Sequence, residues 1–314
     1  QPDILLCRAK NDINQSLKKK IALFTNVPKD AVFSAIDAKS IYDIPIMFSE
    51  QKIDGFMMKH FSLKDRTLNL KPWLDYKKKV KKCKTKLKIA MIGKYVDLLD
   101  SYKSLNEALY HAGVINSRIV DIVYLDSEKL NKRNIARLSE MNGVLVPGGF
   151  GDRGIEGKIL AAQFARINNI PYFGICLGMQ ISVIEFARNV IKLNKANSTE
   201  FNRNTKHPVV ALVEEWRESS GKRVLADKTK MGGTMRLGSQ ECIIGKNTLA
   251  HKMYKKTSIN ERHRHRYEVN GNLIGEFEKN GLAFSGKSKK GNLMEMIELN
   301  NHIWYVGCQF HPEF

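Results

Sequence analysis

Residues 174–180 read GICLGMQ and place a cysteine between two glycines near the middle of the chain. A short apolar run, residues 170–175, precedes the cysteine, and a helix-like pattern follows it over residues 179–187. This order predicts a strand, a tight turn and a helix, with the thiol of Cys176 at the turn. Small neighbours suit such a turn, because the backbone of a nucleophile held there is strained.

The position of Cys176 also indicates reactivity. Free N–H groups at a helix N-terminus favour a thiolate, so we expect the turn to lower the pKa of this thiol. A cysteine nucleophile also needs a proton acceptor and a group that orients the acceptor. The chain ends in QFHPEF, residues 309–314, where His311 can shuttle the proton and Glu313 can orient the imidazole. Together these residues predict an acyl-transfer enzyme.

The surroundings of the turn predict an open α/β sheet flanked by helices. From residue 87 onward, strand-like runs alternate with helix-like segments, which implies right-handed crossovers and a mostly parallel sheet. Past Pro208 the pattern becomes strand-rich, with one strand expected over residues 264–269. Ligands of such sheets bind at the carboxyl ends of strands. One such end carries PGGFG, residues 147–151, whose backbone N–H groups can join that of Leu177 in an oxyanion hole.

A polar stretch, residues 75–86, divides the chain, because it cannot bury enough surface to offset its ordering entropy. We therefore predict one domain over residues 1–70, a linker over residues 71–86 and a second domain over residues 87–314. Within the first domain the sequence predicts short strands at residues 4–9, 21–25 and 32–35 and around Ile46, and a helix over residues 14–20. Another helix is expected over residues 135–141.

Composition narrows the class of protein. An apolar content of 43% suffices for a buried core, and no apolar run approaches the roughly 18 residues of a membrane span. Five scattered cysteines without a C-x-x-C pair indicate free thiols in a reducing, cytoplasmic setting and give no support for zinc. The net charge of +20 lies largely in lysine runs without interleaved aromatic residues, so a nucleic-acid partner is the weakest interpretation.

Three further patterns carry less weight. Residues 149–154 fit G-x-G-x-x-G, but no acidic residue ends the following strand to meet a ribose. The residues around Lys158 fail the phosphate-loop pattern, because Asp152 replaces its first glycine. His263 and His265 alternate at strand spacing, which places both on one face and favours an anion-binding rim over a metal site.

The motifs together resemble the class I glutamine amidotransferases. The resemblance is carried by residues 147–151, 174–180 and 310–314. Further segments are similar to the CTP synthase family: ANSTEF at 196–201, MGGTMRLG at 231–238 and ERHRHRYEV at 261–269. Residues 1–8, 21–24 and 40–42 resemble the end of that family's synthetase domain.

The resemblance implies roles for the glutaminase half. Cys176 would attack the side-chain amide of glutamine, giving a glutamyl thioester and ammonia, with His311 as proton shuttle and Glu313 as its orienter. Gly149 and Leu177 are similar to the oxyanion donors. The residues that the resemblance places around glutamine are Gly149, Leu177, Gly178, Met179, Gln180, Glu200 and Arg266.

For the synthetase half, the resemblance implies that ATP and Mg²⁺ activate UTP, which ammonia converts to CTP. It also implies GTP as an allosteric activator, CTP as a feedback inhibitor and a homotetramer as the assembly. The implied nucleotide-binding residues are Lys20, Ile36, Asp37 and Ala38, where Ile36 replaces a more usual lysine. No metal ligand is expected in this chain. Residues 232–238 are similar to the family's mobile lid.

Neither a phosphate loop nor a magnesium-binding acid is recognisable, and the chain stops before the helix expected to close the glutaminase sheet. We therefore expect a fragment that holds mainly the glutaminase half. Two other interpretations remain: the glutaminase half of another amidotransferase, such as GMP synthetase, and a non-catalytic assembly or regulatory subunit. Residues 1–70 and 262–267 argue against the first, and intact Cys176, His311 and Glu313 argue against the second.

Overall fold

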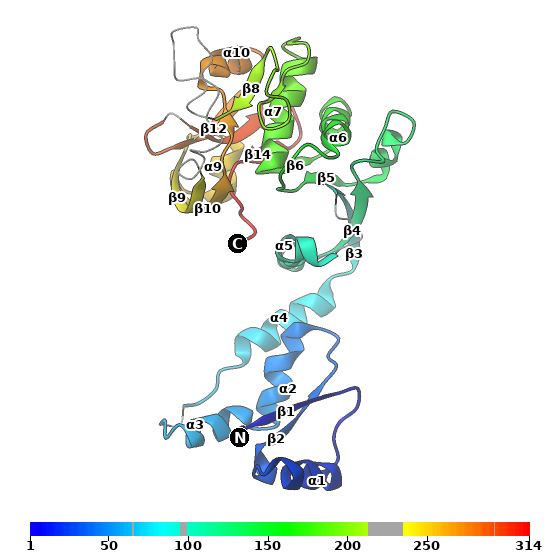
Figure 1. The fold of residues 1–314 in the computed structure, drawn as a ribbon, viewed down its shortest axis with the longest axis vertical. Coiled ribbons are helices and arrows are strands. Elements are labelled where there is room, and N and C mark those ends of the chain that lie inside the picture. The colour runs from blue at the N-terminus through cyan, green and yellow to red at the C-terminus, as the bar shows by residue number, and fades with distance from the viewer. Residues whose placement is uncertain (65, 95–98, 213–234, 292) are drawn as a thin grey trace. The chain divides into compact units, whose positions relative to one another are not determined.

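The computed structural model describes residues 1–64, 66–94, 99–212, 235–291 and 293–314 (Figure 1). The chain forms two compact units, one of residues 1–85 with 114–117 and one of residues 86–113 with 118–314. The segment predicted as a linker contains a helix, α4 (Lys71–Lys82). Its last turn is rich in lysine, which suits the negative end of the helix dipole.

The first unit is built around a parallel pair of strands, β1 (Leu5–Ala9) and β2 (Val32–Ile36), connected by α1 (Gln15–Thr25). The side chain of Asn14 caps α1 by accepting a hydrogen bond from Leu17 N–H at 2.9 Å. The short elements that complete the unit are η1 (Lys29–Ala31), η2 (Ile41–Asp43), α2 (Ile44–Glu50) and α3 (Ile53–His60).

Two strand predictions in this unit are wrong. Residues 21–25 continue α1, and Ile46 lies within α2. An apolar run of four residues is too short to distinguish a strand from a helix by its periodicity. Here the run continues the helix that begins after the cap at Asn14. Of that run only Ala22 is buried, because a helix turns Leu23 and Phe24 toward solvent. Pro45 stands in the first turn of α2, where its missing N–H costs nothing.

In the described residues, the second unit contains a nine-stranded mixed sheet in the order β10-β9-β12-β13-β14-β6-β5-β3-β4. The pairs β14–β6, β6–β5 and β5–β3 are parallel, whereas β10–β9, β9–β12, β12–β13 and β13–β14 are antiparallel. The strands of the parallel half are β3 (Thr85–Gly93), β5 (Gly143–Val146) and β6 (Tyr172–Ile175), and β4 (Arg118–Asp126) lies beside β3 at the edge of the sheet. The others are β9 (Arg236–Ile244), β10 (Ser258–His265), β12 (Leu282–Ser288), β13 (Met294–Leu299) and β14 (Tyr305–Cys308).

Helices and a small sheet surround this large one. The helices α6 (Ile155–Ile167) and α7 (Leu177–Asn189) pack side by side against β5, β6 and β14 (Figure 1). The remaining elements are α5 (Lys103–Ile115), α9 (Leu249–Tyr254), α10 (Ile274–Lys279), η3 (Leu99–Tyr102), η4 (Ile135–Glu140) and η6 (Gly271–Leu273). The small sheet joins β11 (Glu268–Val269), β8 (Pro208–Ala211) and β7 (Asn197–Ser198).

Two details of the second unit differ from prediction. The single strand expected over residues 264–269 is split into the end of β10 and the short β11, which belongs to the other sheet. The helix expected over residues 135–141 is a 3₁₀ helix, η4, only six residues long. Apart from these, the architecture is the α/β sheet with a strand-rich carboxyl-terminal part that the sequence predicts.

Candidate active site

Cys176 stands at a sharp turn between β6 and α7, with φ 51° and ψ −102°. A positive φ at a non-glycine residue is uncommon and strained, which confirms the predicted turn. The two flanking glycines leave no room for a side chain. A Cβ on Gly174 would lie 2.5 Å from the Gly178 backbone, and one on Gly178 would lie 2.1 Å from the Val146 carbonyl oxygen.

The expectation of a lowered thiol pKa is wrong for this structure. Burial raises the pKa of Cys176 to about 12, and the carboxylates of Glu200, Glu313 and Glu268 act in the same direction. The Leu177 backbone N–H lowers the pKa but does not outweigh the burial. The resting group is therefore a thiol, which must give its proton to a base when it attacks.

A histidine–carboxylate pair lies beside this thiol. His311 Nδ1 and Glu313 Oε1 are 2.8 Å apart, which leaves Nε2 of the imidazole for proton transfer. A Cβ built on Gly148 would lie 3.5 Å from His311 Nε2 and 3.6 Å from the Cys176 Cβ, so both side chains border the same glycine. The register explains the approach, because Cys308 at the end of β14 pairs with Ile175 at the end of β6.

A cavity of about 400 Å³ opens at this turn and gathers most of the side chains predicted to hold glutamine. Its lining residues are Gly149, Phe150, Cys176, Gln180, Glu200, Met235, Arg264, His265, Arg266 and Tyr267. A neighbouring pocket of about 350 Å³ is lined by Cys176, His311 and Glu313 among others.

The remaining predicted contacts belong to the first turn of α7 and do not line this cavity. Leu177 and Met179 are buried in the hydrophobic core, and Gly178 packs against β5. Leu177 nevertheless directs its backbone N–H at the sulfur, and its Cδ2 would lie 3.4 Å from a Cβ on Gly149. The two residues predicted as oxyanion donors are thus neighbours.

Glu200 and Gln180 are held in place by hydrogen bonds. Glu200 Oε1 accepts from the Gly151 N–H at 2.9 Å, and burial raises the pKa of this carboxyl. Gln180 Nε2 donates to the Tyr267 carbonyl at 3.0 Å and to Gln309 Oε1 at 3.2 Å. Both amide hydrogens of Gln180 are engaged, so its Oε1 is the atom available to a ligand with N–H donors.

Gln309 was not among the residues predicted to form the site. Its side chain is fully buried, and its Nε2 donates to the Cys176 sulfur at 3.6 Å. The available signal was an amide within an otherwise apolar stretch, residues 303–310, two positions before His311. A polar side chain in such a stretch is buried only when it has a hydrogen-bond partner.

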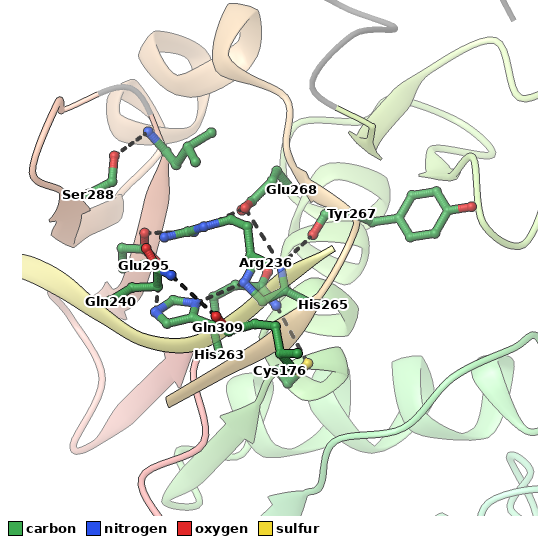
Figure 2. A network of polar contacts seen from close by, with 12 residues as sticks. Cys176, Arg236, Gln240, His263, His265, Tyr267, Glu268, Ser288, Glu295 and Gln309 are labelled. Atoms are coloured by element: carbon green, nitrogen blue, oxygen red, sulfur yellow. Dashed lines mark hydrogen bonds and ion pairs between the residues drawn. The ribbon is translucent and has the colours of Figure 1, made fainter. Parts of the chain in front are cut away.

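The paired histidines do face one side of β10, but the expectation of an anion-binding rim is wrong. His263 and His265 are buried, and their Nδ1 and Nε2 atoms lie 2.8 Å apart (Figure 2). Burial lowers the pKa of His263 to about 3, so the pair is uncharged at neutral pH. Strand spacing places both side chains on one face, and contacts with Glu295, Glu268 and Phe310 make this face interior.

A partly buried arginine connects this pair to two carboxyl groups. Arg236 Nη1 lies 3.1 Å from Glu268 Oε1 and 2.8 Å from Glu295 Oε1, and Glu295 Oε2 lies 3.6 Å from His263 Nε2 (Figure 2). Of the segment predicted as a lid, residues 232–234 lie outside the described residues. Arg236 begins β9, and Gly238 within β9 has a φ of 83°.

The residues predicted to contact nucleotides lie in the first unit, on two separate elements. Lys20 is exposed on α1, and Ile36 ends β2. Asp37 follows it and pairs with Arg8 at 3.3 Å, and the exposed Ala38 comes next. Within the described ranges, no cluster of three or more His, Cys, Asp or Glu side chains could hold a metal ion, and no helix is long and apolar enough to cross a membrane.

Comparisons with known proteins place both parts of the chain in known families. Residues 97–314 match the family model for glutamine amidotransferase class-I, and residues 1–63 match the model for the CTP synthase N-terminus. The glutaminase domain of Trypanosoma brucei CTPS, solved with bound acivicin, is 39% identical with a TM-score of 0.65, over 73% of this chain and 86% of that one.

The chain therefore belongs to the class I glutamine amidotransferases. Within that class it is similar to CTP synthases along its whole length: it is 50% identical to CTP synthase of Buchnera aphidicola subsp. Schizaphis graminum and 49% identical to that of subsp. Baizongia pistaciae. All of this chain is matched, and it spans 57% and 58% of the length of these two relatives.

Proposed function

We propose that this chain carries the glutaminase site of a CTP synthase and releases ammonia from glutamine. One observation carries the proposal: the strained Cys176 borders the cavity formed by Gln180, Glu200 and Arg266 and also lies beside the His311–Glu313 pair. A cysteine, a base and its orienting carboxylate form the arrangement that nucleophilic acyl transfer requires. A non-catalytic subunit would not need a thiol at a strained turn beside such a pair.

In the proposed reaction, Cys176 Sγ attacks the side-chain carbonyl carbon of glutamine while its proton passes to His311 Nε2. The negative charge on the carbonyl oxygen is stabilised by the N–H groups of Gly149 and Leu177. Collapse of the tetrahedral intermediate breaks the C–N bond, and His311 returns the proton to the leaving ammonia. A water molecule, deprotonated by His311, then hydrolyses the thioester to glutamate and restores the thiol.

The same cavity supplies groups for the amino-acid end of glutamine. The carboxylate of Glu200 and the Oε1 of Gln180 are acceptors suited to an α-ammonium group. The guanidinium of Arg266 is a donor suited to the α-carboxylate. A glutamine held by its α-ammonium and α-carboxylate groups would direct its amide toward Cys176. A primary amide that lacks these two groups would bind poorly.

For the whole enzyme, we propose ATP-dependent amination of UTP to CTP, with Mg²⁺ accompanying ATP, GTP as activator and CTP as feedback inhibitor, in a homotetramer. Residues 1–70 would be the end of the synthetase domain, residues 71–86 the linker and residues 87–314 the amidotransferase domain. Lys20 and residues 36–38 would contribute nucleotide contacts. The match of residues 1–63 to the CTP synthase N-terminus favours this enzyme over GMP synthetase.

Replacing the nucleophile tests the proposal. Cys176→Ala should abolish ammonia release from glutamine, measured by coupled glutamate dehydrogenase assay, because the alanine side chain cannot form the thioester. Cys83→Ala, a partly exposed cysteine of the other unit, is the matched control and should retain full activity. Ammonia release by folded Cys176→Ala at the wild-type rate would exclude this site.

A second experiment addresses the division of labour between the domains. In the enzyme that joins this chain to the remaining synthetase part of its relatives, Cys176→Ala should abolish glutamine-dependent CTP formation and leave ammonia-dependent formation intact. Loss of both activities together in a folded variant would contradict two separate sites.

A further inference from the structure

The sulfur of Cys176 has a hydrogen-bond partner that the reaction above does not use. We propose that Gln309 is a further catalytic residue, whose side-chain amide donates to Cys176 Sγ and stabilises the thiolate as the proton leaves for His311. The Nε2 of Gln309 lies 3.6 Å from the sulfur, within the range of an N–H···S hydrogen bond. This inference rests on the proposed glutaminase function and adds a residue to that site.

The direction of this amide is fixed by its neighbours. The Tyr267 carbonyl can only accept, so the group of Gln180 that faces it at 3.0 Å must be the NH₂ group. That same nitrogen faces Gln309 at 3.2 Å, so the atom that receives it must be Oε1 of Gln309. The NH₂ group of Gln309 is then turned to the sulfur. An amide turned the other way would place its NH₂ group against the NH₂ group of Gln180, so that two donors would face each other.

Hydrogen bonds run from Gln180 to Gln309 and from Gln309 to Cys176, and two backbone contacts hold this series in place. The backbone N–H of Gln309 donates to the Glu295 carbonyl at 2.8 Å, which fixes its place beyond β14. The Tyr267 carbonyl that receives Gln180 also lies 3.2 Å from His265 Nδ1 (Figure 2). Donors aligned in one direction polarise each other, so the last N–H of the series favours negative charge on the sulfur.

A second donor to the sulfur is needed once glutamine is bound. At rest, the Leu177 N–H also faces the thiol. In the proposed reaction this N–H turns to the oxyanion of the substrate and can no longer serve the sulfur. The negative charges of Glu200 and Glu313, and that of Glu268 where it is ionised, disfavour a thiolate. Gln309 is the donor that stays on the sulfur through the attack.

The test measures the thiol directly. The rate of alkylation of Cys176 by iodoacetamide is followed by peptide mass spectrometry from pH 7 to 10.5 in the full chain. Gln309→Met keeps the length of the side chain and removes the donor. Its pH–rate curve should be displaced by about one pH unit to higher pH, which is about tenfold slower alkylation at a given pH. Gln240→Met, on partly exposed β9, is the matched control and should superimpose on wild type.

Turnover provides a second readout. Gln309→Met should lower kcat for ammonia release about tenfold and leave KM for glutamine within about twofold, because the lost donor acts on the sulfur and not on bound substrate. If Gln309→Met does not fold, Gln309→Glu is used instead, because it keeps the shape of the side chain and replaces the donor by an acceptor. The displacement of its alkylation curve to higher pH then tests the proposal.

A folded Gln309 variant whose alkylation curve coincides with wild type would overturn the proposal. Failure of the wild-type chain to release ammonia from glutamine is a separate result, because it would contradict the proposed glutaminase function. The alkylation curves would then still establish whether the amide stabilises the thiolate.

Discussion

The parallel and antiparallel halves of the nine-stranded sheet bring different chemistry to one cavity. In the parallel half, β5 and β6 end in glycine-rich turns, and much of what they present is backbone, apart from the thiol of Cys176. In the antiparallel half, β9, β10 and β13 contribute the partly buried Arg236 and the buried side chains of His263, His265 and Glu295. Backbone geometry fixes the position of the nucleophile, whereas side chains distant in sequence set the electrostatics behind it.

Beside each half of the sheet lies a partly buried arginine paired with buried carboxyl groups, and the two arginine pairs connect different elements. Arg166 on α6 holds Glu185 on α7 through two hydrogen bonds of 2.8 and 2.7 Å and joins the two helices. Arg236 instead sits between Glu268 and Glu295, which also face the histidine pair. The first pair joins two helices that pack on the sheet, and the second lies within the polar network that ends at the active-site cavity.

After the loss expected for Cys176→Ala, the largest effect lies at the junction of the two halves, where His311 follows β14. His311→Ala should lower the rate of ammonia release about 10²- to 10⁴-fold, because it removes the base for a thiol that is protonated at rest. Glu313→Gln should cost less, because the amide still orients the imidazole. Steady-state assays on folded variants measure both, and a greater loss in Glu313→Gln than in His311→Ala would reverse the roles assigned to this pair.

The two arginine pairs give the next test. Arg236→Met should lower the free energy of unfolding by about 3–5 kcal/mol, because it removes the cation that is hydrogen-bonded to two buried carboxyl groups. Arg166→Met should cost a similar amount for the same reason. Only Arg236→Met should also move the pH–rate curve for alkylation of Cys176, because Glu268 acts on that thiol. Urea unfolding and alkylation of Cys176 in both variants measure these effects. Equal shifts of the alkylation curves in Arg236→Met and Arg166→Met would show that the two arginine pairs do not differ in their effect on the thiol.

The smallest effect concerns the pH dependence of stability. Burial raises the pKa of Glu268 to about 8, although Arg236 opposes the shift. Between its unfolded pKa near 4.5 and about 8, the folded state keeps a proton that the unfolded state releases, so this group makes stability fall as pH rises. Over pH 6.5 to 8 the fall is about 2 kcal/mol. Below pH 6.5 the buried histidines act in the opposite direction.

The free energy of unfolding of Glu268→Gln should therefore no longer fall between pH 6.5 and 8. That of Glu276→Gln, on the exposed face of α10, should still fall. Urea unfolding at pH 6.5, 7.25 and 8 measures the slope for both variants and for wild type. An unchanged slope in Glu268→Gln would mean that this carboxyl is already ionised in the folded protein throughout the range.

Features encoded by a few adjacent residues could be predicted from sequence, and features set by distant contacts could not. The turn at Cys176 follows from its own glycines, and its positive φ agrees with that prediction. The pKa of the same thiol was predicted in the wrong direction, because its burial comes from packing that no local pattern reports. The spacing of His263 and His265 predicted their shared face but not that it is interior. Residues 21–25 failed as a strand because a short apolar run has no period.

The backbone of Cys176 has a consequence for how this position can change over time. At φ 51° and ψ −102°, every side chain is strained by about 1–3 kcal/mol, and glycine alone adopts such torsions without penalty. Cys176→Gly should therefore unfold at higher urea concentration than Cys176→Ala. If the chain no longer needed the thiol, a single change of Cys176 to glycine would increase its stability. The cysteine at this position therefore lowers the stability of the fold relative to glycine.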